Sequence, residues 1–209
     1  MTVYFYLHGF ASSPLSRKAQ DLRDRFAALN LTLYTPDLNQ NDFTHLTLTR
    51  QIQQVCAGFS ADQPIVLIGS SLGGLTAAWV GEHCPQVDRL VLLAPAFEFL
   101  THWLPKLGDK RLREWQSGTP LMVYHHGAKR LLPLNYQFVV DCDRYSSAHL
   151  QKPIPTLIVH GISDEVIPIQ MSRNYAHSRP WVELVELNSD HALADVSQEI
   201  WGSISQFLL

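Results

Sequence analysis

Short apolar runs alternate along the chain with segments in which apolar residues recur at helical spacing. Six predominantly apolar runs are each long enough for one strand, at residues 3–7, 31–34, 64–68, 89–94, 156–160 and 181–187. Apolar strands that alternate with helices are typical of a parallel sheet covered on both faces. The pattern therefore predicts an α/β fold with a parallel sheet of about six strands and helices on both faces.

Helical periodicity marks the segments between these strands. The first helix is expected after Ser13, a suitable N-cap, with Pro14 at its first position. Further helices are expected at about residues 48–59 and 72–83, from about 169 onward, and at 196–207.

The alternation stops between Pro95 and Pro155, and a structureless connection of that length is uncommon in a compact domain. We interpret residues of about 96–154 as a cap-like insert within a single domain that spans 1–209. Within it, residues 118–124 and 135–140 can pair as a hairpin. The insert carries eight of the 21 aromatic residues, which either form its own small core or wall an apolar substrate pocket.

The segment from Gly69 to Gly73 fits the pattern G-x-S-x-G, with a strand before it and a helix after it. In that context the pattern indicates a nucleophile elbow, a sharp turn that exposes a serine at the end of a strand. Ser71 is then the candidate nucleophile, and the backbone N–H of Leu72 is expected to point at a developing oxyanion. The alternative is an ordinary turn between a strand and a helix.

His8, Gly9 and Phe10 follow the first strand, where a second oxyanion donor is expected when a serine lies at such an elbow. We assign that donor to the backbone N–H of Phe10. We interpret His8 as a structural histidine and not as a base. A plain turn is the alternative for this loop.

A serine hydroxyl needs a base, and histidine is the usual one. In this arrangement the acid and then the histidine follow the serine along the chain. His191, directly after the last strand, has the expected place among the ten histidines. His177 lies in a predicted helix, and His125 and His126 lie in the insert, where we interpret them as surface or hairpin residues. His160 ends a strand, where we expect it to be buried beside the site.

The acid should hold the imidazole in one tautomer and stabilise its charged form. Asp164 is favoured because it lies just beyond the penultimate strand. Glu165 is the nearest rival and Asp190 the next. Asp141 and Asp143, at the end of the insert, are interpreted as solvated loop charges.

These motifs, in this order, resemble the α/β-hydrolase superfamily over essentially the whole chain. Residues 6–14 and 69–74 are similar to the small YqiA-like esterases. The resemblance implies hydrolysis of carboxylic esters or thioesters, with an acyl-Ser71 intermediate and no cofactor. It also implies that the chain begins at what is usually the third strand of the fold.

Several activities use a triad of serine, histidine and an acid such as Ser71, His191 and Asp164. We favour a carboxylesterase for small or medium apolar acyl esters, with a thioesterase, a peptidase and a cofactor-free haloperoxidase as alternatives. A non-catalytic ligand-binding protein of the same fold is the alternative of another class, and the presence of Ser71, Asp164 and His191 argues against it.

Charge and cysteine content argue against several partners. A net charge of −3 gives no reason to expect nucleic acid or an anionic membrane surface, so the expected partner is a small-molecule ester or thioester. The three cysteines are widely spaced, which predicts neither a disulfide framework nor a metal site. Without a recognisable leader peptide or an apolar span, a cytoplasmic location is expected.

Overall fold

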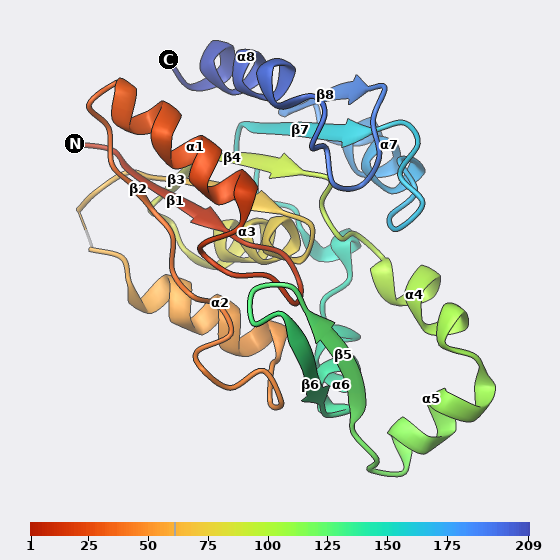
Figure 1. Ribbon diagram of the computed structural model, residues 1–209. Coiled ribbons are helices and arrows are strands. Elements are labelled where there is room, and N and C mark those ends of the chain that lie inside the picture. Colours follow the sequence, from red (N-terminus) through yellow and green to blue (C-terminus); the bar gives the residue numbers. More distant parts are fainter. Residues whose placement is uncertain (61) are drawn as a thin grey trace.

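A six-stranded parallel sheet forms the centre of the protein, and the computed structural model describes residues 1–60 and 62–209. The strand order is β2-β1-β3-β4-β7-β8 (Figure 1). Each strand begins and ends within two residues of its predicted position. The bounds are β1 Val3–Leu7, β2 Leu33–Tyr34, β3 Ile65–Ser70, β4 Val87–Leu93, β7 Thr156–Gly161 and β8 Val182–Leu187.

Helices cover both faces of the sheet. One face carries α1 (Arg17–Ala28) and α8 (Ser197–Leu208), and the other carries α2 (Leu48–Ala57), α3 (Leu72–His83) and α7 (Gln170–His177). None of the helices in the described part of the chain combines the length and the apolar composition that crossing a membrane requires.

Strand β4 explains why the predicted strands lack a regular alternation of apolar and polar residues. Leu90 and Leu92 belong to the core beneath α2 and α3, whereas Val91 and Leu93 belong to the core beneath α1 and α8. Because successive side chains of a strand point to opposite faces, a strand between two helical layers buries both sets.

The first helix begins later than the sequence predicted. Helix α1 starts at Arg17, and its N-cap is Ser16, whose Oγ accepts the N–H of Ala19 at 3.3 Å. Ser13 lies in a turn before the helix, where its carbonyl oxygen accepts the N–H of Ser16 at 3.1 Å. The assignment of Ser13 as the N-cap was therefore wrong.

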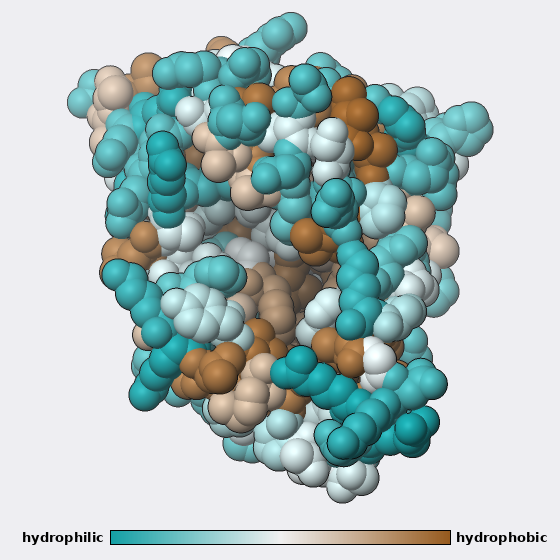
Figure 2. Space-filling model, turned by 45° about the vertical axis from the view of Figure 1, so that its right-hand side comes forward, coloured by the Kyte–Doolittle hydropathy of each residue, from teal (hydrophilic) through white to brown (hydrophobic). Residues whose placement is uncertain are grey.

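Residues 96–154 contain regular elements of their own: α4 (Phe99–Leu107), α5 (Asp109–Gln116), β5 (Leu121–His125), β6 (Arg130–Leu134), α6 (Gln137–Cys142) and the 3₁₀ turn η1 (Ser147–His149). β5 and β6 form an antiparallel hairpin. The prediction that residues 135–140 form the second strand of this hairpin was wrong. Phe138 and Val139 are neighbours that are both buried, which a helix turn allows and a strand with one covered face does not. Figure 2 shows a hollow with a largely apolar floor in the molecular surface.

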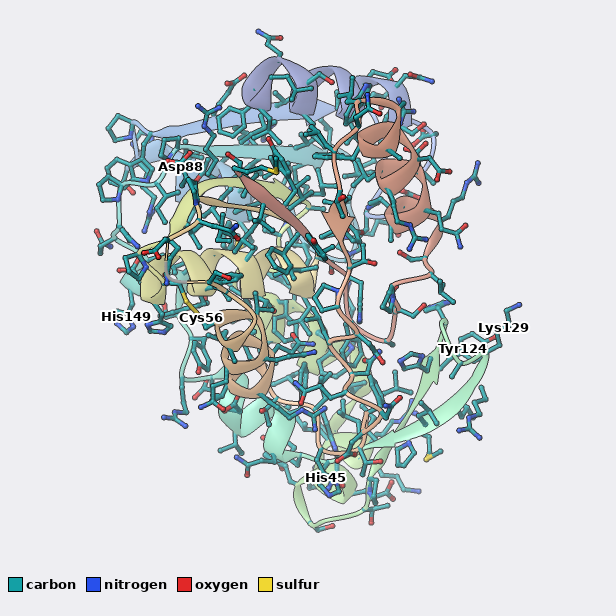
Figure 3. All side chains as sticks on the ribbon, turned by 90° about the vertical axis from the view of Figure 1, so that its left-hand side faces the viewer. His45, Cys56, Asp88, Tyr124, Lys129 and His149 are labelled. Carbon is teal, nitrogen blue, oxygen red and sulfur yellow. A yellow bond between two sulfur atoms is a disulfide. The ribbon has the colours of Figure 1, made fainter. Side chains whose placement is uncertain are left out.

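Cys56 in α2 and Cys84, directly after α3, are joined by a disulfide (Figure 3). This disulfide corrects the expectation, drawn from the odd number and wide spacing of the cysteines, that they form no disulfide framework. The two residues become neighbours only when α2 packs on α3, a contact that the spacing does not reveal. Cys142 is a free, buried thiol.

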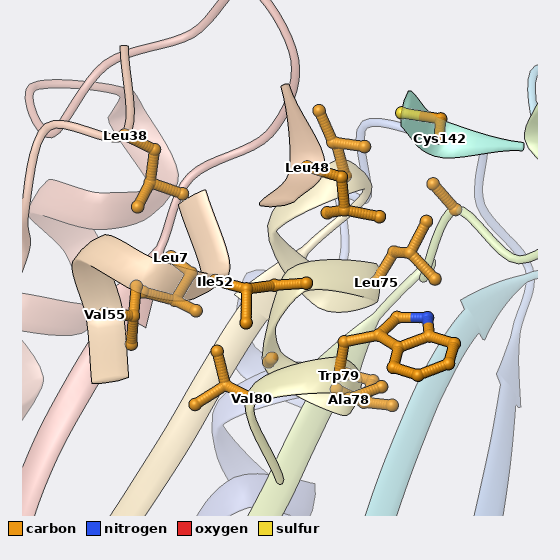
Figure 4. Close-up of a cluster of buried hydrophobic side chains, with 14 of the residues drawn as sticks. Leu7, Leu38, Leu48, Ile52, Val55, Leu75, Ala78, Trp79, Val80 and Cys142 are labelled. Carbon is orange, nitrogen blue, oxygen red and sulfur yellow. The ribbon is translucent and has the colours of Figure 1, made fainter. Parts of the chain in front are cut away.

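The insert also contributes to the main core. Cys142 of α6 lies in the same buried cluster as Leu48 and Ile52 of α2 and Leu75 and Trp79 of α3 (Figure 4). The last part of the insert is therefore anchored on the same helices that cover the sheet.

Gly73 determines how closely α3 packs on the sheet, because a Cβ at this position collides with the carbonyl oxygens of Leu7 and His8. We expect Gly73→Ala to lower the free energy of unfolding by at least about 2 kcal/mol, measured by urea denaturation. The control is Gly202→Ala in α8, where a Cβ meets no described atom within 4 Å. Alanine there should stabilise the protein by about 0.5–1 kcal/mol. Equal effects of the two substitutions would contradict this account of the packing.

Candidate active site

Ser71 lies in a strained turn between β3 and α3. Its backbone has φ 54° and ψ −120°, a combination that residues other than glycine rarely adopt. The turn is tight, because a Cβ at Gly69 collides with the carbonyl oxygen of Gly73. The segment thus has the strand–turn–helix form of a nucleophile elbow.

Ser71, His191 and Asp164 form one hydrogen-bonded chain. The Nε2 atom of His191 lies 3.0 Å from the Oγ of Ser71, and its Nδ1 lies 2.6 Å from Oδ2 of Asp164. The three residues follow the carboxyl ends of β3, β7 and β8, which meet at one edge of a parallel sheet. When Nδ1–H is donated to the carboxylate, the Nε2 lone pair faces the serine hydroxyl and can accept its proton.

The Asp164 carboxylate is buried and accepts four hydrogen bonds. Its Oδ1 accepts the backbone N–H groups of Val166 and Ile167, both at 2.8 Å. Its Oδ2 accepts from His191 and from Nε2 of His160, which lies 3.1 Å away. Burial by itself raises the pKa of Asp164, but the hydrogen bonds outweigh burial and hold that pKa well below its usual range. The carboxylate is therefore ionised at neutral pH.

His160 is a second, fully buried histidine on the same carboxylate. Its Nε2 also lies 3.0 Å from the carbonyl oxygen of Ile167, so both of its neighbours are acceptors and Nε2 carries the hydrogen. Nδ1 then accepts the hydroxyl hydrogen of Ser172 at 2.7 Å. The sequence predicted the burial of His160 beside the site, but not its hydrogen bond to Asp164.

The rival acids lie in other environments. Glu165 is exposed, and Asp190 accepts two backbone N–H groups of its own loop. The interpretation of Asp141 as a solvated loop charge was wrong: it is buried and accepts the N–H and the hydroxyl of Thr49 at 2.8 and 2.6 Å. Asp143 is exposed, as expected.

Three further histidines lie in other roles or positions. The Nε2 of His8 accepts the N–H of Leu38 at 3.0 Å, so Nδ1 donates to the carbonyl oxygen of Gly9 at 2.9 Å, which is the structural role predicted for it. His125 is buried at the end of β5, and His177 is the last residue of α7.

The predicted oxyanion residues, Phe10 and Leu72, line the same cavity as Ser71. Leu72 is the first residue of α3, where backbone N–H groups have no acceptor within the helix. The loop of Phe10 passes directly beside the serine, because a Cβ at Gly9 would lie only 3.3 Å from the Cβ of Ser71.

This cavity has a volume of about 240 Å³ and predominantly apolar walls. Its outer wall is formed by the insert, which contributes Ala96, Phe99, Trp103 and Lys106. The Nζ of Lys106 donates to the carbonyl oxygen of Glu165 at 2.6 Å. This hydrogen bond joins α4 to the loop that carries Asp164.

Sequence reasoning missed Lys18, which lies behind the elbow. Its Nζ donates to Oγ of Ser70 at 3.0 Å. Burial lowers the pKa of Lys18 to about 8, although the carboxylates of Asp190 and Asp164 favour its charged form. The sequence carries no signal for this contact, because a lysine in an amphipathic helix normally faces solvent. In residues 1–60 and 62–209, no group of three or more His, Cys, Asp or Glu side chains is arranged to hold a metal ion.

Solved structures with the same fold cover almost the whole chain. Mouse alpha/beta hydrolase domain-containing protein 10 has a TM-score of 0.77 and 21% identity, over 98% of this chain and 88% of that one. Est1E from Butyrivibrio proteoclasticus has a TM-score of 0.75 and 17% identity, over 99% of this chain and 88% of that one. Est1E has also been solved with ferulic acid bound. These similarities confirm the α/β-hydrolase fold.

Sequence comparison gives a narrower relationship. The mouse mitochondrial palmitoyl-protein thioesterase ABHD10 is 27% identical over 126 residues, which is 56% of this chain but only 40% of that protein. A family model described as "Uncharacterised protein family (UPF0227)" matches residues 3–208. The chain therefore belongs to the UPF0227 family, and its fold is that of the α/β hydrolases.

Proposed function

We propose that this protein is a serine hydrolase that cleaves carboxylic esters of small or medium apolar acyl groups. The observation that carries the proposal is the hydrogen-bonded chain of Ser71, His191 and Asp164 at an apolar cavity. A nucleophile, a base and an ionised acid in this geometry are what acyl transfer through serine requires.

In the proposed reaction the Oγ of Ser71 attacks the acyl carbonyl carbon while Nε2 of His191 takes its proton. Asp164 keeps the imidazole in the correct tautomer and stabilises the imidazolium. The same proton passes to the leaving alcohol oxygen, which departs as the acyl–Ser71 ester forms. His191 then takes a proton from water as the water oxygen attacks the acyl carbon. The bond between the acyl carbon and Oγ breaks, the proton passes from His191 to Oγ of Ser71, and the carboxylic acid leaves.

The backbone N–H groups of Phe10 and Leu72 are the proposed donors to the oxyanion of each tetrahedral intermediate. Two features support this assignment: both residues line the cavity beside Ser71, and Leu72 begins a helix. Fixed backbone donors at a helix N-terminus stabilise developing negative charge without reorganising during the reaction.

Residues 96–154 act, in this proposal, as a cap within a single domain. Phe99 and Trp103 of α4 form part of the wall that an acyl group would contact. A volume of about 240 Å³ is below the range of roughly 300–1,000 Å³ typical of pockets for drug-sized ligands, which favours acyl groups of limited size.

A thioesterase is the second candidate, because the curated relative is named a palmitoyl-protein thioesterase. The same triad serves a thiol leaving group, so the two activities differ in the substrate and not in the catalytic residues. A cytoplasmic location stays a prediction, since the same relative is named as mitochondrial.

Ser71→Ala should abolish covalent labelling by a fluorophosphonate probe and lower kcat for p-nitrophenyl esters by up to ~10⁶. The matched control is Ser70→Ala, which removes the neighbouring hydroxyl that binds Lys18 and should keep labelling. Undiminished turnover by purified Ser71→Ala protein would overturn the proposed function.

Asp164→Asn should lower kcat by up to ~10⁴, because an amide no longer selects the productive tautomer of His191. Glu165→Gln, at the adjacent exposed position, should have little effect on kcat.

The depressed pKa of Asp164 also makes the stability of the protein depend on pH. An unfolded aspartate ionises near ~3.9, so the stabilisation by the folded carboxylate is full above about pH 5 and is lost as pH falls below it.

The difference in unfolding free energy between the wild-type protein and Asp164→Asn should therefore shrink as the pH is lowered from about 7 to about 3, measured by urea denaturation. A difference that stays constant over this range, or a larger loss of kcat in Glu165→Gln, would show that Asp164 does not have the assigned role.

Trp103→Ala should enlarge the cavity and shift the preference towards longer acyl chains. We expect the ratio of kcat/KM for octanoyl over butanoyl p-nitrophenyl esters to rise by about tenfold. Tyr124→Ala serves as the control, because Tyr124 is 51% exposed on the hairpin and does not line the cavity. An unchanged ratio in folded Trp103→Ala protein would mean that the insert does not select the acyl group.

A further inference from the structure

The hairpin of β5 and β6 is apolar on both of its faces. Cross-strand partners share a face, so Leu121 with Leu134 and Val123 with Leu132 form the inner face. The inner pairs pack on the hydrophobic core. The outer face carries the pairs Met122 with Pro133 and Tyr124 with Leu131.

An outer face of this composition is unusual. A ribbon with one covered face normally alternates apolar and polar side chains, so that polar groups meet water. Here Met122, Tyr124 and Leu131 are 44%, 51% and 56% exposed. Neighbouring exposed apolar side chains of this kind mark interaction sites more often than isolated ones do.

Basic residues outnumber acidic ones in this part of the chain, although Glu114 lines the same depression as Arg111 and Met122. Residues 96–154 hold eight of the 16 Lys and Arg but only five of the 19 Asp and Glu, so the insert carries +3 in a chain of net charge −3. Arg111 donates from Nη2 to the carbonyl oxygen of Met122 at 3.2 Å, and Lys129 and Arg130 lie at the hairpin turn. Figure 3 shows Tyr124 and Lys129 at the outer edge of the molecule.

We propose that this surface, defined by Met122, Tyr124, Leu131, Pro133, Arg111 and Lys129, docks the protein on an anionic lipid surface. The apolar side chains enter the boundary between headgroups and acyl chains, and the cations contact lipid phosphates. A second copy of the chain is disfavoured as the occupant, because a two-fold contact through this surface brings the cations of both copies together.

The docking surface and the acyl cavity belong to the same insert. Trp115 connects them: its Nε1 donates to the carbonyl oxygen of Leu134 at 2.7 Å, and its ring lies 5.6 Å from that of Trp103 in the cavity wall. Docking by the hairpin therefore holds the proposed ester site close to a surface in which apolar esters accumulate. Lipid binding itself does not depend on the proposed hydrolysis.

The test is flotation of the full-length protein with vesicles of phosphatidylcholine, with and without phosphatidylglycerol. The wild-type protein should float only with the anionic vesicles, and added salt should weaken its binding. Met122→Ser with Leu131→Ser, and separately Arg111→Glu with Lys129→Glu, should each lower the partition coefficient by at least about tenfold.

The matched charge control is Arg17→Glu with Arg23→Glu in α1, outside the insert, which changes the net charge equally and should keep binding. Leu15→Ser, at a position 69% exposed, is the control for lost apolar surface.

The proposal is overturned if the wild-type protein does not float with anionic vesicles, or if both controls weaken binding as much as the hairpin variants. A dimer in light scattering that Leu131→Ser disrupts would also overturn it, in favour of self-association. Ser71→Ala protein should bind the vesicles normally, which separates this result from the test of hydrolysis.

Discussion

The buried, ionised carboxylate of Asp164 is the group on which the arrangement of the site depends. A carboxylate without solvent is strongly unfavourable unless hydrogen bonds replace its hydration. Two of its partners come from its own loop, and two are the imidazoles of His160 and His191. These contacts join β7, the loop after β8 and, through His191, the elbow after β3. The position of His191 relative to Ser71 is thus a consequence of satisfying one buried charge.

The same burial explains why so much was predictable from the sequence. Strands that are covered on both faces are predominantly apolar, so β3, β4 and β7 appear as nearly continuous apolar runs between helical segments. A parallel sheet also brings the carboxyl ends of its strands to one edge. Ser71, Asp164 and His191 could therefore be placed together from their positions after strands. The elbow was predictable because the close approach of neighbouring backbone leaves no room for a Cβ at positions 69 and 73.

The failures concern contacts between residues that are distant in sequence and are not set by strand order. Asp141 is buried because Thr49 of α2 supplies two hydrogen bonds, 92 residues away. Cys56 and Cys84 meet only through the packing of α2 on α3. Likewise, 135–140 contains apolar residues that suit a strand, yet Phe138 and Val139 are both buried by a helical turn. In each case the local sequence was compatible with two structures, and a contact with a residue distant in sequence determined which one forms.

The net charge of the whole chain hides how unevenly charge is distributed between its parts. A net charge of −3 argued against an anionic surface as a partner, but that value combines an insert of +3 with a remainder that is strongly acidic. The field that a lipid headgroup experiences falls off within about a Debye length, ~8–10 Å at physiological salt. Only the residues around Tyr124 and Leu131 would therefore be felt at the docking surface. The acidic remainder would instead disfavour any orientation other than the one that presents the hairpin, so the asymmetry that the average conceals would itself orient the molecule.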